Sequence, residues 1–161
     1  MIVIDTCILS SLAKAGRLDL LRWFGNACTS PGVIREISSS GNPGLDKCVS
    51  EALTDWLTVR TVNNPEELSA LQERYPVLGH VDCELVLLSR ELKSALITDD
   101  SRLIEEAEAK FGIETFDLCD VLVVLRKKEK IDDKQLNELI VELERKDHYK
   151  FSYESLRLLE R

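Results

Sequence analysis

Long hydrophobic runs are missing from this sequence of 161 residues. No apolar segment approaches the roughly 20 residues that a membrane-spanning helix requires, so no membrane span is predicted. The N-terminus also lacks the basic start and apolar stretch of a secretory signal peptide, because Asp5 interrupts the first hydrophobic residues. We therefore expect a cytoplasmic protein.

Closely spaced cysteine pairs are missing too. The cysteines are odd in number and form no C-x-x-C motif or Cys/His cluster, which argues against a disulfide framework and a structural zinc site. None is followed six residues later by the arginine of a cysteine phosphatase. We interpret them as small buried residues of a protein from a reducing compartment. They are Cys7, Cys28, Cys48, Cys83 and Cys119.

Several catalytic motifs have no counterpart in the chain. The phosphate-binding pattern G-x-x-x-x-G-K does not occur. The two histidines, His80 and His148, stand beside no nucleophile motif, so Ser-His-Asp catalysis is unsupported. A phosphatase of the haloacid-dehalogenase type would need a second aspartate two residues after Asp5, where Cys7 stands.

Positive charge is also in short supply. The chain has 21 Lys and Arg against 29 Asp and Glu, which gives a net charge of −8. The excess of acids lies in residues 1–125, with 11 basic and 20 acidic side chains, whereas residues 126–161 hold 10 and 9. An acidic protein is a poor general binder of polyanions. If the substrate is nucleic acid, a bound divalent cation is the obvious means of offsetting the repulsion.

Five short apolar segments have the composition of strands. Helical patterns of about ten residues separate them, which predicts right-handed crossovers and an α/β fold. The central, mostly parallel sheet of such a fold is covered by helices on both faces. We expect one domain over residues 1–161, with the C-terminal helices of residues 117–161 packed on it. The predicted strands are residues 2–4, 26–30, 57–62, 94–98 and 113–116.

Carboxylates follow or flank these strands. Asp5 ends the first strand, and Asp99 and Asp100 end the fourth; Glu36 lies on the helix after the second strand, and Asp82 opens the helix before the fourth. Parallel sheets bind ligands at the carboxyl ends of their strands. Acids from four segments at that rim are typical of a Mg²⁺ or Mn²⁺ site. Each acid alone is more often a helix cap or a solvated residue, so the prediction depends on their joint placement.

Two pairs of acids compete for this site. Asp82 and Glu84 differ by about 200° around a helix, so both are not expected to reach one metal. Asp99 and Asp100 point apart if the strand geometry persists.

Four segments resemble a known family: IVIDTCILSSLAKAGRL, SPGVIREI, GHVDCELVLLSREL and LITDDSRL. In this order they resemble the PIN-domain ribonucleases, and more narrowly a branch related to VapC toxins and to an uncharacterised prokaryotic PIN-like family. The resemblance covers roughly residues 1–125, and FSYESLRLLE is similar to the tail of the narrower branch. Two positions depart from the pattern, since Cys7 replaces a common Ser or Asn and His80 a frequent Glu.

The resemblance implies a three-layer PIN-like fold and a toxin-like, metal-dependent endoribonuclease that hydrolyses phosphodiester bonds of single-stranded RNA. It implies that Asp5, Asp82 and Asp100 bind Mg²⁺ or Mn²⁺, and that Glu36 binds directly or through water. Further residues are expected to support these catalytic carboxylates, the threonines by orienting them. They are Thr6, Thr98, Asp99 and Glu84.

The resemblance also implies partners besides the RNA substrate. A toxin-like nuclease implies an antitoxin protein that places Arg or Lys at the carboxylates. A homodimer is implied as well, for which the apolar face of Leu118, Leu122 and Leu125 is a candidate surface. The alternative for that face is a stripe of core residues.

Two other interpretations stay open. A PIN fold that no longer cuts would serve as an RNA- or protein-binding module, although clustered carboxylates without a metal would repel one another. A receiver-like Mg²⁺-binding signalling domain also collects acids at strand ends. Its acidic pair follows the first strand, however, whereas here the pair follows the fourth.

Overall fold

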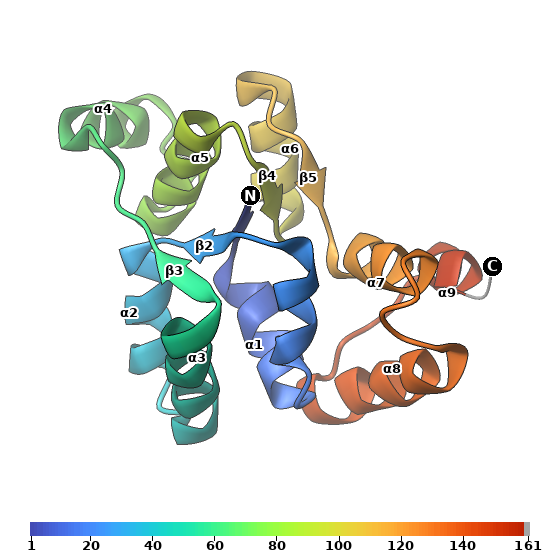
Figure 1. The fold of residues 1–161 in the computed structure, drawn as a ribbon. Helices are drawn as coiled ribbons and strands as arrows, with labels where there is room; N and C mark the ends of the chain where they lie inside the picture. The colour runs from blue at the N-terminus through green and yellow to red at the C-terminus, as the bar shows by residue number, and fades with distance from the viewer. Residues whose placement is uncertain (160–161) are drawn as a thin grey trace.

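The centre of the fold is a sheet of five parallel strands in the order β3-β2-β1-β4-β5 (Figure 1). The computed structural model describes residues 1–159. In the middle strand, Ile2 lies opposite Ala27 of one neighbour and Ala95 of the other. The prediction of an α/β fold with a parallel central sheet is therefore confirmed. The strands are β1 Ile2–Ile4, β2 Ala27–Thr29, β3 Leu57–Val59, β4 Ala95–Ile97 and β5 Thr115–Phe116.

Helices connect successive strands and flank the sheet (Figure 1). The segment between α1 and β2 is a 3-10 helix, η1, and the last three helices follow β5. The helices of the first part are α1 Thr6–Lys14, η1 Leu18–Phe24, α2 Pro31–Ser39, α3 Pro43–Asp55 and α4 Pro65–Arg74. Those of the second part are α5 His80–Leu92, α6 Ser101–Phe111, α7 Leu118–Lys127, α8 Asp133–Asp147 and α9 Tyr153–Leu159.

Short polar side chains stand where strands pass into helices. Asp5, Ser30, Asp100 and Asp117 each cap the helix that follows and accept a hydrogen bond from a backbone N–H group of its first turn. Aspartate and serine are among the residues that best satisfy these otherwise unpaired N–H groups. Because parallel strands end at the same edge of a sheet, the capping pattern gathers carboxylates at that edge.

The core lies between the sheet and its helices. Val3 and Ile4 of the central strand have no exposed surface. Helix α5 packs against β1 and β4, and its residues Leu85 and Leu88 are buried. Within residues 1–159, none of the helices combines the length and the hydropathy needed to cross a bilayer.

The apolar face of α7 belongs to this core. Leu118, Leu122 and Leu125 are at most 1% exposed, because α7 packs against β5, α8 and α9. The candidate dimer surface on this face is therefore wrong, and the alternative of a core stripe is correct. The spacing of three and four residues is the same for a stripe that meets a partner and for one that meets the chain's own helices.

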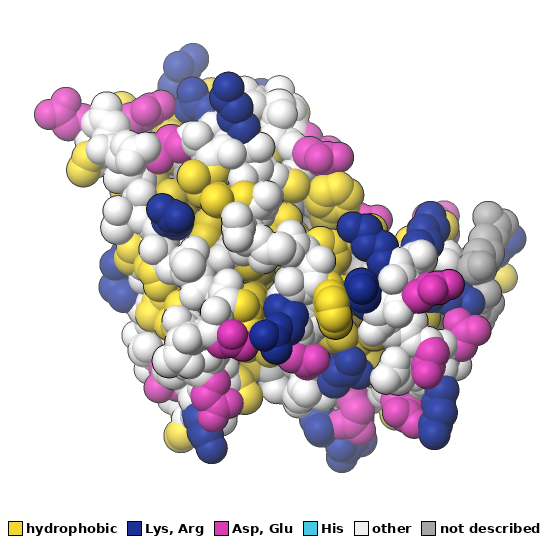
Figure 2. Space-filling model, in the orientation of Figure 1, with side chains coloured by type: hydrophobic (Ala, Val, Ile, Leu, Met, Phe, Trp, Pro, Cys, Tyr) yellow, Lys and Arg dark blue, Asp and Glu magenta, His cyan; other side chains and the backbone are white. Residues whose placement is uncertain are grey.

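Of the C-terminal helices, α8 lies beside α1 (Figure 1). Asp147, the last residue of α8, accepts hydrogen bonds from the Ser11 hydroxyl (2.5 Å) and from the Lys14 ammonium group (2.6 Å), both on α1. The space-filling view shows basic and acidic side chains interspersed over these helices (Figure 2). This mixture agrees with the near-neutral balance of residues 126–161.

Candidate active site

Asp5 is both a helix cap and a buried acid at the carboxyl edge of the sheet. Only 8% of the residue is exposed. Its Oδ1 atom accepts from the Thr6 N–H (2.6 Å), and Oδ2 accepts from the Thr98 hydroxyl (2.6 Å) and the Cys7 thiol (3.1 Å). Three donors from two strand ends therefore fix the orientation of this carboxylate.

Thr98 connects Asp5 to Asp100. Its side chain is fully buried between the two, and its hydroxyl oxygen accepts from the Asp100 N–H (3.1 Å) while the hydroxyl donates to Asp5. The Asp100 carboxylate caps α6 by accepting from the N–H groups of Arg102 (2.9 Å) and Leu103 (3.1 Å). The ends of β1 and β4 are thus held together by one threonine.

Asp82 approaches from the start of α5. Its Oδ2 atom accepts from the Gly79 N–H (2.8 Å). Burial raises the pKa of Asp82; the bond from Gly79 opposes this shift, and the charges of Asp5, Asp100 and Glu36 raise the pKa further. Carboxylates from four separate segments therefore repel one another in one region of the molecule.

Glu36 reaches this region from α2. Its Oε2 atom accepts a hydrogen bond from the hydroxyl of Thr6, the residue next to Asp5. The contact joins α2 to the first turn of α1, so Thr6 donates its backbone N–H to one acid and its hydroxyl to another. This threonine orients both carboxylates.

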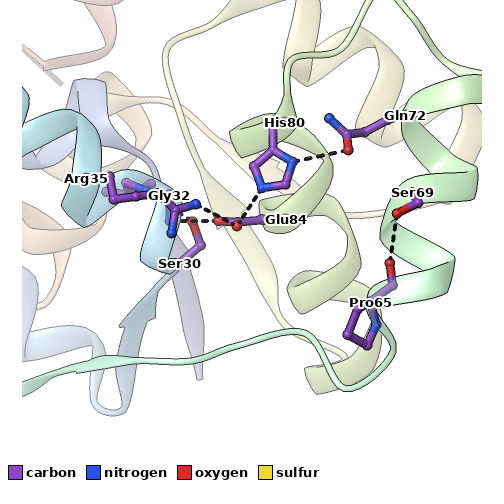
Figure 3. Close-up of polar contacts among 9 residues, drawn as sticks. Ser30, Gly32, Arg35, Pro65, Ser69, Gln72, His80 and Glu84 are labelled. Atoms are coloured by element: carbon purple, nitrogen blue, oxygen red, sulfur yellow. Dashed lines mark hydrogen bonds and ion pairs between the residues drawn. The ribbon is translucent and has the colours of Figure 1, made fainter.

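Glu84 lies with a different set of partners, which Figure 3 draws. Its carboxylate accepts from the Gly32 N–H (2.8 Å) and pairs with Arg35 (3.2 Å) and with Nε2 of His80 (3.1 Å). Burial acts to raise the pKa of Glu84, but hydrogen bonds from Ser30 and Gly32 and the charges of His80 and Arg35 lower it overall. The Glu84 carboxylate therefore binds the N-terminal part of α2.

His80 is held on both ring nitrogens. Its Nδ1 atom contacts Oε1 of Gln72 on α4 (3.1 Å), while Nε2 contacts Glu84 (Figure 3). At the position where the narrower branch often has Glu, this chain therefore has a side chain that pairs with Glu84.

Asp99 has different hydrogen-bond partners from Asp100, and both residues lie beyond the end of β4. Its Oδ1 atom accepts from the Leu118 N–H (2.9 Å) and the Tyr149 hydroxyl (3.1 Å), and its own N–H donates to the Cys7 sulfur (3.3 Å). Burial raises the pKa of Asp99. This residue connects the end of β4 to α7 and to the C-terminal segment.

Cys7 and Tyr149 are site neighbours that the sequence patterns did not single out as functional. Burial, with the charge of Asp5, raises the pKa of Cys7 to about 12, so it remains a thiol that donates to Asp5. A cysteine two residues after an aspartate gives no hint of this role by itself. Tyr149 could not be found from local spacing, because its partner Asp99 is 50 residues away.

The donor set suits a hard divalent cation, since it consists of carboxylate oxygens. In the described part of the chain, no group of three or more His, Cys, Asp or Glu side chains is already arranged to hold a metal ion. The repulsion that raises the pKa of Asp82 is nevertheless of the kind that a cation relieves. The chemistry of these residues therefore fits Mg²⁺ or Mn²⁺.

Comparison with family models decides the family. The model DUF3368, described as a PIN domain, matches residues 1–159. This chain belongs to the PIN-domain family. PIN domains are generally nucleases and typically use divalent metals, and both properties agree with acids gathered at the carboxyl edge of this sheet. A comparison with curated proteins gave no match.

Proposed function

We propose that this PIN domain is a metal-dependent endoribonuclease that hydrolyses phosphodiester bonds of single-stranded RNA in a toxin-like role. The observation that carries the proposal is that two threonines join three of its acids: Thr98 links Asp5 to Asp100, and Thr6 links Asp5 to Glu36. Burial raises the pKa of the fourth acid, Asp82, and the charges of the other three raise it further. Carboxylates gathered in one region repel one another, and a bound cation relieves that repulsion.

In this proposal Asp5, Asp82 and Asp100 hold Mg²⁺ or Mn²⁺, and Glu36 binds directly or through water. When bound, the ion would supply Lewis-acid chemistry toward a phosphoryl oxygen and would lower the pKa of a water molecule. The chain's own residues orient the carboxylates. Thr98 fixes Asp5 relative to the backbone of Asp100, and the Thr6 N–H and the Cys7 thiol fix the orientation of the Asp5 carboxylate.

The charge balance supports a cation between enzyme and substrate. The protein carries a net charge of −8, and RNA is a polyanion. A divalent ion at the carboxylates offsets their repulsion of the scissile phosphate. The resemblance to VapC toxins adds two partner proposals: an antitoxin that presents Arg or Lys to the acids, and a homodimer. The dimer would use a surface other than the buried face of α7.

A second candidate is a PIN-fold RNA- or protein-binding module that does not cut. The observation that favours it is that no ready-made three-ligand group exists among residues 1–159. The two candidates differ in whether bound RNA is cleaved when Mn²⁺ is supplied.

Cleavage of a labelled single-stranded RNA tests the proposal. We expect cleavage with Mn²⁺ or Mg²⁺, none with EDTA, and none from Asp5→Asn, which keeps the capping oxygen but removes the charge. The matched control is Asp19→Asn, an exposed acid in the first turn of η1. RNA that binds intact in every metal condition would favour the binding module instead.

A further inference from the structure

The last residue of α8 and the residues that follow it contact two elements that carry acids of the proposed site. Asp147 holds α1 through Ser11 (2.5 Å) and Lys14 (2.6 Å), and Asp5 caps the start of that helix. Two residues later, Tyr149 donates to Asp99, the neighbour of Asp100 (3.1 Å). Figure 1 shows the end of α8 next to α1. One short segment therefore contacts both the C-terminal half of α1 and the β4–α6 junction.

A continuous series of hydrogen bonds runs from this segment to Asp5. The Tyr149 hydroxyl donates to Asp99 Oδ1 (3.1 Å), the Asp99 N–H donates to Cys7 Sγ (3.3 Å), and the Cys7 thiol donates to Asp5 Oδ2 (3.1 Å). Burial, with the charge of Asp99, raises the pKa of Tyr149, so its hydroxyl remains protonated. This series joins Tyr149 to the Asp5 carboxylate through two intervening residues, Asp99 and Cys7.

A purely structural role does not account well for Asp99, because part of its carboxyl group lowers the stability of the fold. Its Oδ2 atom is buried and has no hydrogen-bond partner among the described residues. A buried carboxyl oxygen without a partner destabilises the fold, and apolar groups of similar shape are commonly no worse for stability. A polar connection of this kind specifies position rather than adding net stability.

We propose that Tyr149 is a positioning residue of the acidic centre, which sets the orientation of Asp5 through Asp99 and Cys7. The C-terminal segment thereby completes a site that β1 and β4 begin. This inference rests on the proposed function, because it assumes that Asp5 binds the metal.

The test compares Mn²⁺ affinity, by isothermal titration calorimetry, in the full-length wild type, Tyr149→Phe and the matched control Tyr153→Phe, whose residue is 76% exposed. Removing the hydroxyl should weaken Mn²⁺ binding by about tenfold, the lower end of effects from outer partners of metal ligands. The kcat for RNA cleavage should fall with KM unchanged, and Tyr153→Phe should match the wild type.

The outcomes separate the two proposals. Wild-type affinity in Tyr149→Phe would overturn the positioning role while leaving the metal centre intact. A wild type that binds no Mn²⁺ would overturn both. If Tyr149→Phe does not fold, the Cys7 pair decides: Cys7→Ala should lose Mn²⁺ affinity and Cys7→Ser, which keeps a donor to Asp5, should restore it. Equal affinities for Cys7→Ala and the wild type would refute the inference.

Discussion

The hydroxyl of Thr98 lies between two acids of the candidate site, donating to Asp5 over 2.6 Å and accepting from the backbone of Asp100 over 3.1 Å. The two acids are separated by 95 positions in the chain, yet one fully buried side chain fixes both. The relationship ties the end of β1 to the end of β4, and the proposed chemistry depends on that tie.

Replacing Thr98 by valine keeps the shape of the side chain and removes both hydrogen bonds. We expect the free energy of unfolding to fall by about 1–3 kcal/mol, because polar partners in a buried setting are left unpaired. The control is Thr58→Val at an exposed position of the edge strand β3. Its hydroxyl donates to the Ala27 carbonyl (3.2 Å), but the residue is exposed to water, so a change within about 0.5 kcal/mol is expected. Urea denaturation measures both values, and equal losses in the two variants would contradict the role of Thr98.

Asp82 and Glu84 should respond differently to neutralisation. Asp82→Asn should abolish cleavage of single-stranded RNA, because Asp82 is a proposed metal ligand. The charges of the other three acids raise its pKa. Glu84→Gln should keep the rate within a few-fold, since this carboxylate binds Gly32, Arg35 and His80. Initial rates are compared at a temperature where both variants are folded. An inactive Glu84→Gln beside an active Asp82→Asn would show that the helix face has been misassigned.

Gly32 and Gly44 offer a matched pair, because each follows the proline that starts its helix. A Cβ atom at Gly32 would stand 2.5 Å from Oε2 of Glu84 and 2.8 Å from Cγ2 of Val81, whereas at Gly44 the nearest atom is 3.4 Å away. The Glu84 carboxylate cannot move away from this Cβ atom without losing its hydrogen bond from the Gly32 N–H.

We therefore expect Gly32→Ala to destabilise the protein by about 1–3 kcal/mol through overpacking. Gly44→Ala should be neutral or stabilising by up to about 1 kcal/mol, the usual gain of alanine in a helix. Thermal unfolding monitored by circular dichroism compares them. A stabilised Gly32→Ala would show that the contact between α2 and α5 is looser than described.

Leu122→Glu tests the assignment of the α7 face. Leu122 has no exposed surface, so an unpaired charge there should destabilise the fold by several kcal/mol. Circular dichroism and light scattering should show a loss of folded protein. A folded monomer at 18.3 kDa, formed from a dimeric wild type, would return this face to the dimer interface.

The sheet and most helices could be predicted from the sequence, because each apolar strand is short and its following helix begins with a strong capping residue. Asp5 and Asp100 were placed at the carboxyl edge for the same reason. The role of Leu122 could not be read in this way, since a helical apolar stripe has the same period in a core and in an interface.

The remaining features depend on contacts between distant segments. Glu84 is committed to α2 only because α2 starts beside α5, and Tyr149 meets Asp99 only because α8 packs on α1. No local pattern encodes either contact. That the four acids together bind a metal stays a prediction.

The most direct test of that claim is thermal unfolding with and without millimolar Mn²⁺, for the wild type, Asp5→Asn and the control Glu84→Gln. A ligand that binds only the folded state at 100 times its Kd adds about 2.7 kcal/mol of stability. We predict a clear rise in Tm for the wild type and Glu84→Gln, and loss of most of that rise in Asp5→Asn. Melting curves that Mn²⁺ leaves unchanged in all three proteins would contradict the metal centre.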